Sequence, residues 1–392
     1  MNLQNPKKFK MLVDQAHEVA LNVLRPISRK YDKAEHAYPK ELDMLSSLVD
    51  GMNEGGEGMN AGAAGAGKRS EDTTAGNRNG TNMSTALSII EMCYGDTGLL
   101  LSMPRQGLGN SAIAAVANDE QLERFKGTWA AMAITEPNCG SDSAAIRTTA
   151  IKDGDDYILY GDKLFVTSGD RADSVVVWAT LDKNLGRAAI KSFVVAKGTF
   201  GMTIERLEHK LGIKASDTAV IRFIDCRVPA ENLLGNADID ISKGFAGVME
   251  TFDNTRPLVA AMAVGCAKAS LERIKEIFRH QLDLTYSTPY LHTSNIAAQI
   301  YRMEAEWEAA RLLTLKATWM ADNKKPNSKE ASIVKAKAGR IGNEITLKCV
   351  ELAASIGYNE DDLLEKWKRD TKILDIYEGT QQIQQLIIAR RE

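Results

Sequence analysis

The stretch Ile376-Tyr377-Glu378-Gly379-Thr380 runs directly into Gln381-Gln382-Ile383-Gln384-Gln385 near the C-terminal end of the chain. Glycine after the glutamate allows a ligand or a second backbone segment to approach closely. Thr380 is a typical N-cap residue, and apolar residues then recur at helical spacing, so a helix is predicted to begin here. Because a helix N-terminus offers free N–H groups to an anionic oxygen, Glu378 could act as a base at the mouth of a site. On these residues alone, a capping or dipole-matching role for Glu378 is the alternative.

A second stretch, from Ala133 to Ala145, reads Ala-Ile-Thr-Glu-Pro-Asn-Cys-Gly-Ser-Asp-Ser-Ala-Ala. Together with the Tyr-Glu-Gly-Thr stretch, it resembles the acyl-CoA dehydrogenase family of flavoproteins, and its medium- and short-chain members in particular. Another family signature is matched from Glu351 to Asp370, except that Ala354 stands where the family has glycine. Further family-like stretches follow the family's order and spacing: Gly161 to Thr167, Lys210 to Thr218 and Phe252 to Pro257.

Composition excludes several other classes of protein. Hydrophobic residues make up 44% of the 392-residue chain and charged residues 26%, with a formal net charge of −3, which argues against a nucleic-acid-binding protein. No run approaches the ~20 apolar residues of a membrane span, and residues 1–10 lack the apolar core of a signal peptide, so a cytoplasmic, non-membrane protein is expected. The five cysteines are scattered, which indicates reduced, buried thiols, and the five histidines lack metal-ligand spacing, so no metal site is expected.

Hydrophobic periodicity changes twice along the chain. Residues 1–129 show helical spacing, broken by Pro26 and Pro39 and by a Gly-rich insertion over residues 51–82, which is either a surface loop or a substrate lid. Residues 130–236 hold short β-rich runs between glycine turns. These runs are Tyr157 to Tyr160, Ser174 to Thr180, Ser192 to Ala196 and Ala219 to Ile224.

Residues 237–392 return to helical spacing, with three long helices expected at Phe245 to Phe278, Asn295 to Asp322 and Lys329 to Ile356. The sequence thus predicts a multi-domain α+β protein, with an N-terminal helical domain, a small central all-β module and a C-terminal helical bundle. The resemblance implies that the central module is a β-barrel or sandwich and that the C-terminal part is a four-helix bundle. The acyl-CoA dehydrogenase fold has the same order of domains.

The resemblance implies an FAD-dependent enzyme that converts an acyl-CoA thioester to the trans-2-enoyl-CoA. A base takes the α-proton while a hydride leaves the β-carbon for flavin N5. The match assigns the base to Glu378, whose backbone N–H would bond the thioester carbonyl together with a ribityl hydroxyl. Burial beside an apolar substrate would raise the pKa of Glu378 and make its carboxylate a stronger base. Some members carry the base on a middle helix, but the matching residue here is Thr255, which cannot serve as one.

Cofactor and substrate contacts are also implied by the resemblance. The loop over residues 132–141 would lie along the flavin ring, with an aromatic wall at Phe165 where the family often has tryptophan. Taken without the family, Thr135-Glu136-Pro137 would simply be a turn. Arg256 could instead form a structural salt bridge, for example with Asp253 or Glu250. FAD contacts are expected from Met132, Ile134, Thr135, Gly140, Ser141, Phe165, Thr167, Thr380 and Gln382. Substrate contacts are expected from Ser141, Asp253, Thr255, Arg256 and Gly379.

One region departs from the family. Most members carry an Arg-x-x-Phe-Gly pattern and a later glutamine that reach across a subunit interface to hold the flavin's pyrophosphate and adenine. The matching residues here are Asp283 to Ser287 and Ser294, and an anionic Asp283 would repel a pyrophosphate. Glu351 also replaces a supporting glutamine, and side chains at Ala354 and Ser355 would obstruct close backbone approach.

Two explanations of this departure remain open, besides a shifted alignment near Arg279 and His280. The chain holds FAD by other contacts, as a homodimer or homotetramer, or it pairs with a homologous subunit in a heterotetramer of the actinobacterial type. The resemblance implies the electron-transferring flavoprotein as electron acceptor. Alternatives are an acyl-CoA oxidase and a flavin-poor or non-catalytic subunit. Acyl length is not readable, because Leu100, Leu101 and Met103 could line the pocket floor or belong to the core.

Overall fold

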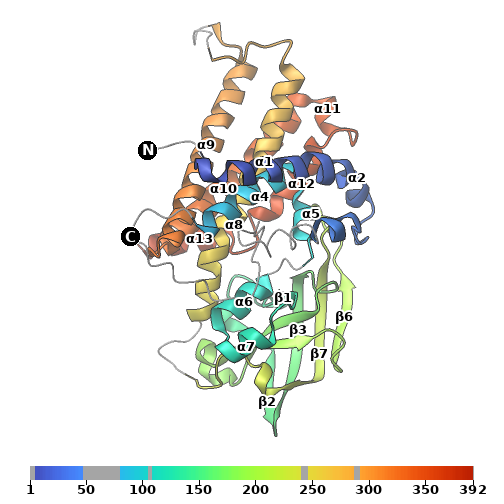
Figure 1. Ribbon diagram of the computed structural model, residues 1–392, viewed down its shortest axis with the longest axis vertical. Helices are drawn as coiled ribbons and strands as arrows, with labels where there is room; N and C mark the ends of the chain where they lie inside the picture. Colours follow the sequence, from blue (N-terminus) through green and yellow to red (C-terminus); the bar gives the residue numbers. More distant parts are fainter. Residues whose placement is uncertain (1–4, 47–79, 105–107, 240–245, 287–291, 392) are drawn as a thin grey trace.

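The computed structural model describes residues 5–46, 80–104, 108–239, 246–286 and 292–391, with side chains from residue 255 onward in the fourth range. Helices from both ends of the chain pack together, and the central sheet lies below them (Figure 1). Most of the Gly-rich insertion, from 51 to 79, falls outside the described residues, so the choice between surface loop and lid stays open. Among the described helices, none is both long and apolar enough to cross a membrane.

The N-terminal part is helical, as predicted, but one expected break is wrong. A helix was expected to end at Pro26, whereas the chain stays helical there, because proline in the first turn of a helix loses no needed N–H bond. A π-helical segment joins the two helices on either side. The elements are η1 (Lys7–Phe9), α1 (Lys10–Val19), η2 (Ala20–Leu24), α2 (Arg25–Lys33), α4 (Thr81–Gly95), α5 (Thr97–Leu101), α6 (Leu108–Val116) and α7 (Asp119–Arg124).

The central part is one seven-stranded sheet in the order β1-β4-β2-β3-β7-β6, with β5 also pairing with β4. Strand β4 is buried along its whole length and pairs in parallel with β1, from Ala130 opposite Ser174 to Ala133 opposite Val177. The other long pairings are antiparallel. The strands are β1 (Ala130–Ala133), β2 (Thr149–Asp153), β3 (Asp156–Thr167), β4 (Ser174–Thr180), β5 (Ile190–Ala196), β6 (Met202–Leu207) and β7 (Thr218–Pro229), and the short 3-10 helices are η3 (Ser143–Ala145), η4 (Lys183–Ala189) and η5 (Ala230–Asn232).

The C-terminal part contains the three long helices expected from the sequence. The third ends earlier than predicted, at Ala353, because Ala354 adopts a left-handed conformation with φ of 49°. The helices are α8 (Ala246–Phe278), α9 (Asn295–Asp322), α10 (Ser328–Ala353), α11 (Ser355–Tyr358), α12 (Leu364–Leu374) and α13 (Gln381–Ala389). The α+β architecture is therefore confirmed, while the boundaries at 129/130 and 236/237 stay predictions.

A buried ion cluster joins the three parts. The Lys366 Nζ lies 2.7 Å from Asp96 Oδ2 and 2.5 Å from Asp370 Oδ2, and all three side chains are almost fully buried. The second oxygen of Asp370 accepts the backbone N–H of Ile213 at 2.5 Å. Since each charge is paired, the cluster fixes α5, α12 and the β6–β7 loop relative to one another. All five cysteines are buried free thiols, as the sequence indicated.

Candidate active site

Glu378 lies in the short turn between α12 and α13. Glu378 and Gly379 both have left-handed backbones, with φ of 59° and 94°. This conformation is costly for a glutamate and persists only where its surroundings enforce it. The φ of Gly379 favours glycine, and an added Cβ would come within 2.4 Å of Gln384 Nε2, so that side chain would have to shift. Thr380 accepts the N–H of Ile383 at 3.5 Å and caps α13, which confirms the N-cap prediction.

The Glu378 carboxylate meets the middle of α8. Thr255 Oγ1 donates a 2.7 Å hydrogen bond to Glu378 Oε2, and Thr255 is itself buried. Burial raises the pKa of Glu378, and this outweighs the opposing effects of the Thr255 hydrogen bond and of the positive charges on Arg256 and Lys335. A carboxylate with a raised pKa is a stronger proton acceptor once it is ionised. The geometry therefore suits a general base.

Two buried cations flank the same turn. Arg256 lies beside the carboxylate with 3% of its surface exposed. Its alternative salt bridges with Asp253 or Glu250 involve side chains outside the described residues. Lys335 on α10 is fully buried, and its Nζ donates a 2.6 Å hydrogen bond to the carbonyl of Gly379.

The loop from residue 133 to 145 leaves β1 and is held by a buried ion pair. Lys163 Nζ lies 2.7 Å from Glu136 Oε1 and also donates to the carbonyl of Ile134 at 3.2 Å. Glu136 further accepts the N–H groups of Arg147 and Thr148 at 2.7 and 3.0 Å, and the Thr148 hydroxyl at 2.6 Å. Although burial raises the pKa of Glu136, the Lys163 charge and these hydrogen bonds hold it below its usual range. These interactions hold the loop in place, and the Thr135-Glu136-Pro137 turn lies within the part that they hold.

A second segment, at the end of β3, lies beside this loop. The N–H of Leu164 donates to the Thr135 carbonyl at 2.8 Å. Phe165 follows with a left-handed φ of 57° and a side chain that is 61% exposed. An added Cβ at Gly140 would meet nothing within 4 Å, so local packing does not require a glycine there. An exposed ring beside hydroxyl-bearing residues and open space suits a flat heterocyclic ligand.

Comparison with known proteins identifies the family of the chain. Residues 131–226 match the sequence model of the acyl-CoA dehydrogenase middle domain, and residues 242–392 match that of the C-terminal domain. The chain is 32% identical to the mitochondrial short-chain specific acyl-CoA dehydrogenase of Rattus norvegicus, over 99% of this chain and 90% of the relative. The chain belongs to the acyl-CoA dehydrogenase family. It is therefore an oxidoreductase, of a family whose members are generally FAD-dependent, as the sequence resemblance predicted.

Two further similarities extend over the whole chain. The acryloyl-CoA reductase (NADH) of Anaerotignum propionicum is 32% identical over 100% of this chain and 95% of its own length. The solved structure of butyryl-CoA dehydrogenase from Megasphaera elsdenii gives a TM-score of 0.83 at 29% identity, covering 100% of this chain and 99% of that chain.

The structure gathers the predicted site residues of this acyl-CoA dehydrogenase into two groups. Thr255, Arg256 and Gly379 lie around Glu378, with Thr380 capping the helix that follows. Asp253 lies on α8, but its side chain is outside the described residues. Gln382 is exposed on the first turn of α13. The second group lies on the two braced segments and consists of Met132, Ile134, Thr135, Gly140, Ser141, Phe165 and Thr167.

Sequence reasoning missed three side chains of the site: Glu136, Lys163 and Lys335. Lys163 had a signal, because it stands on β3 between apolar residues that face the core of the sheet, where an unpaired charge would be costly. Glu136 lies inside the quoted 133–145 stretch and was read only as part of a turn. Lys335 had a weaker signal, as a single lysine on the buried face of α10.

The departure from the family pattern has local structural explanations. Asp283 accepts the N–H of Thr285 at 3.1 Å and its hydroxyl at 2.5 Å, which closes a small turn. Ser294, at the expected glutamine position, caps α9 by accepting from Ala297 at 3.1 Å. The Tyr286 hydroxyl donates to Glu304. The Asp283, Tyr286 and Ser294 side chains therefore all form hydrogen bonds within the chain itself.

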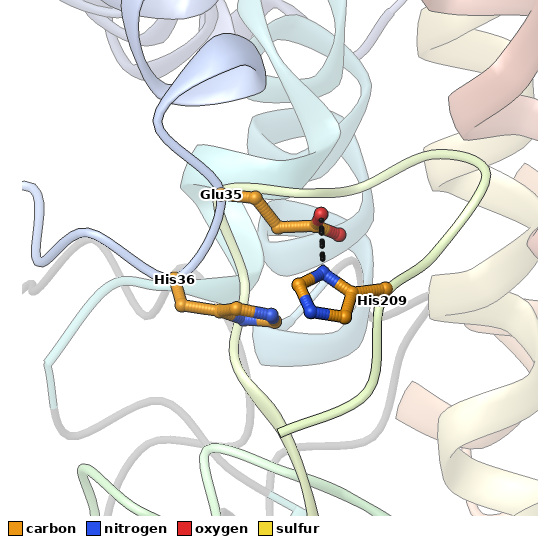
Figure 2. Close-up of side chains that lie close together, drawn as sticks. All are labelled: Glu35, His36 and His209. Atoms are coloured by element: carbon orange, nitrogen blue, oxygen red, sulfur yellow. Dashed lines mark hydrogen bonds and ion pairs between the residues drawn. The ribbon is translucent and has the colours of Figure 1, made fainter. Parts of the chain in front are cut away.

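Folding brings Glu35, His36 and His209 together, although the spacing of the histidines indicated no metal site (Figure 2). One potential ligand atom from each lies within 4.8 Å of the others, and His209 Nδ1 is 3.0 Å from Glu35 Oε2. However, Glu35 also accepts the N–H of Lys210 at 2.9 Å and lies 3.9 Å from Lys214 Nζ. The Lys214 charge would repel a divalent ion, so the cluster is better described as a hydrogen-bonded contact between the end of α2 and the β6–β7 loop.

Proposed function

We propose that this chain catalyses the α,β-dehydrogenation of an acyl-CoA thioester to the trans-2-enoyl-CoA, with Glu378 as the base that removes the α-proton. One observation carries the proposal: a partly buried carboxylate of raised pKa sits in a strained turn, oriented by a hydrogen bond from Thr255. Strained backbone and shifted pKa values gather at catalytic sites, and both are found here on one residue.

The residues around Glu378 supply what proton removal next to a thioester needs. Such a proton is weakly acidic, so negative charge developing on the thioester oxygen must be stabilised. The N–H of Glu378 is proposed to donate to that oxygen, while Thr255 keeps the carboxylate in one orientation. Gly379 leaves room for the thioester beside the turn. Arg256 adds positive charge close to the place where the anion would form.

We propose FAD as the cofactor, held by Met132, Ile134, Thr135, Gly140, Ser141, Phe165, Thr167, Thr380 and Gln382. The exposed Phe165 ring and the open space at Gly140 fit a flat ring system, and the Glu136–Lys163 ion pair would keep the loop in shape for it. When bound, FAD would supply the acceptor for the hydride that leaves the substrate's β-carbon. The chain's own residues bind and orient this group.

The substrate's acyl group is proposed to be short, because two of the matched proteins are named for short-chain and butyryl substrates. Leu100 and Met103 are buried in the hydrophobic core, and a closed end to the acyl site is proposed there. Ser141 and Asp253 are proposed as further contacts of the substrate. The electron acceptor is proposed to be the electron-transferring flavoprotein.

A homologous second subunit is proposed to complete the flavin site. Asp283, Ser294 and Tyr286 make bonds within this chain and present no cation where the family pattern has an arginine. A partner that carries the intact pattern would supply that charge over Glu378 of this chain. The alternative is a homotetramer or homodimer that holds the pyrophosphate by other contacts.

The test is a visible spectrum of the chain purified alone and after co-expression with a homologous subunit encoded nearby, before and after anaerobic addition of butyryl-CoA. A yellow protein that loses its colour with butyryl-CoA supports the dehydrogenase, and colour that needs the partner supports the shared site. A flavin that no acyl-CoA reduces would overturn the proposal. Rapid peroxide formation in air would favour an acyl-CoA oxidase.

A further inference from the structure

Lys335 occupies an unusual place for a lysine. It lies in the middle of α10 with its side chain fully buried, and its Nζ reaches the carbonyl oxygen of Gly379 at 2.6 Å. Lysine is rarely buried unless its charge is paired, because desolvation of an ammonium group is costly. Here the nearest described acceptor is a backbone carbonyl of the turn that carries Glu378. The ammonium group therefore stabilises this turn through its hydrogen bond to the Gly379 carbonyl.

Gln384 approaches the same turn from α13. Its Nε2 donates to the carbonyl of Glu378 at 3.0 Å and to that of Gly379 at 3.2 Å, and the side chain is fully buried. Its Oε1 is buried and has no hydrogen-bond partner among the described residues. A buried acceptor left unpaired costs free energy, so the orientation of this amide is set by the two carbonyls that it serves.

The turn needs this support because of its backbone. Both Glu378 and Gly379 are left-handed, and a glutamate in that conformation costs about 1 kcal/mol or more. Donors from α10 and α13 converge on the two carbonyls and compensate for this cost. If they were lost, the turn could relax toward the right-handed region, and the carboxylate would move away from Thr255.

The charge of Lys335 also acts on the base. The groups that face Glu378 are Thr255 and Arg256 from α8 and Lys335 from α10, with Tyr377 next to it in the chain. Those that face Lys335 are Asp375, Glu378 and Arg256. Burial lowers the pKa of Lys335 to about 8, and the two carboxylates oppose that shift, so the lysine is still charged at neutral pH. Its charge favours the ionised form of Glu378.

We propose that Lys335, together with Gln384, is a positioning residue for the base: the two side chains hold the carbonyls of Glu378 and Gly379 by hydrogen bonds, and the Lys335 ammonium lies behind the turn. This inference rests on the proposed dehydrogenase function. It assigns to Lys335 a role in proton removal without any contact with substrate.

The experiment uses the flavin-loaded protein, with its partner subunit if one is required, and two variants. Lys335→Met removes both the bond and the charge, whereas Gln384→Leu removes one set of bonds and keeps the charge. Lys348→Met is the matched control, because Lys348 is an exposed lysine on the same helix, paired with Glu351. The rate of flavin reduction by butyryl-CoA is measured against pH, together with the melting temperature and the dissociation constant of crotonyl-CoA.

We expect Lys335→Met to slow flavin reduction at pH 7 by about tenfold to a hundredfold, with crotonyl-CoA binding changed much less. Loss of the positive charge raises the pKa of Glu378, so the acid side of the pH profile moves upward by about one unit. Gln384→Leu slows reduction without moving the profile, because the charge remains. Lys348→Met behaves like the unaltered protein.

Equal rates and equal pH profiles for Lys335→Met and the unaltered protein would overturn the inference while leaving the dehydrogenase intact. If the unaltered protein itself is not reduced by any acyl-CoA, the proposed function fails instead. If Lys335→Met does not fold, Gln384→Leu decides: a slowed reduction at unchanged melting temperature supports the positioning role, and an unchanged rate rules it out.

Discussion

In the family pattern, the positions of the Glu378 turn and those of Asp283 and Ser294 all contact a flavin, yet in this chain the two sets are built differently. At Glu378, side chains from α8, α10 and α13 converge on one strained turn. At Asp283, the carboxylate accepts two hydrogen bonds from Thr285, two residues further along the chain. Strain held by distant buried groups is typical of a working site, whereas locally satisfied polar groups are typical of an ordinary surface turn.

Under the proposed shared site, the two halves of the family's flavin site would come from different chains. The half around Glu378 has the backbone, the hydrogen bonds and the raised pKa of a base. At the position where the family pattern has an arginine, this chain has Asp283, whose negative charge would repel a pyrophosphate. The following predictions test each half and the segments that support the fold around them.

The largest effect is expected from Glu378→Gln, which keeps the size of the side chain and removes its basicity. Flavin reduction by butyryl-CoA should fall by at least about 10³-fold, because general base catalysis is lost. Stopped-flow absorbance checks the rate, and an unchanged flavin spectrum and melting temperature check the fold. Normal bleaching would show that another residue is the base.

Lys163→Met tests the buried Lys163–Glu136 ion pair that holds the 133–145 loop. It leaves the Glu136 carboxylate buried without its ion pair, so the free energy of unfolding should fall by about 3–5 kcal/mol. Urea unfolding measures this change. The double variant Lys163→Met/Glu136→Gln removes both charges and should recover part of the loss, whereas Lys126→Met, at an exposed pair, should change stability by less than about 1 kcal/mol.

Asp283→Arg tests the half of the flavin site in which this chain departs from the family pattern. Replacing an anion with a cation at the position of the family's arginine should increase flavin retention by the lone chain about tenfold, provided that two copies associate. Flavin content after dialysis measures retention, with Asp283→Asn as the control that removes the negative charge only. Equal retention by the Arg and Asn variants would show that this loop does not face a pyrophosphate.

The smallest effect is expected at Ala354. This residue ends α10 with φ of 49°, a conformation that glycine adopts without steric cost and alanine does not. Ala354→Gly should therefore raise the free energy of unfolding by about 1 kcal/mol. Chemical denaturation checks the change, and a loss of stability would mean that the alanine methyl group packs usefully.

Much of the fold could be predicted from the sequence. The long helices were expected close to their observed bounds, because their apolar residues repeat at helical spacing and prolines separate them. Strands β3, β4, β5 and β7 contain the expected runs, while β1, β2 and β6 are short and lack a clear alternation. Pro26 was misread because its effect depends on where the helix begins.

Prediction of the site was less complete. The base turn could be quoted from the sequence because its motif is contiguous and its N-cap is a local feature. The hydrogen bond that orients the base joins residues 123 positions apart, and no spacing rule predicts such a contact. The hydrogen bond between Glu35 and His209 was missed for the same reason, since the two residues lie 174 positions apart.

By itself the sequence determined the order of helical and β-rich parts, the extent of the long helices and the Tyr-Glu-Gly-Thr turn, because these follow from periodicity and from the chemistry of neighbouring residues. Tertiary structure alone decided which charges are buried and which contacts they make. Lys163 pairs with Glu136 beneath the 133–145 loop, Lys366 pairs with Asp96 from a distant part of the chain, and Lys335 donates to the turn that carries Glu378. The physical reason is that the free energy of a charge depends on its surroundings, and those are supplied by segments far away in the chain.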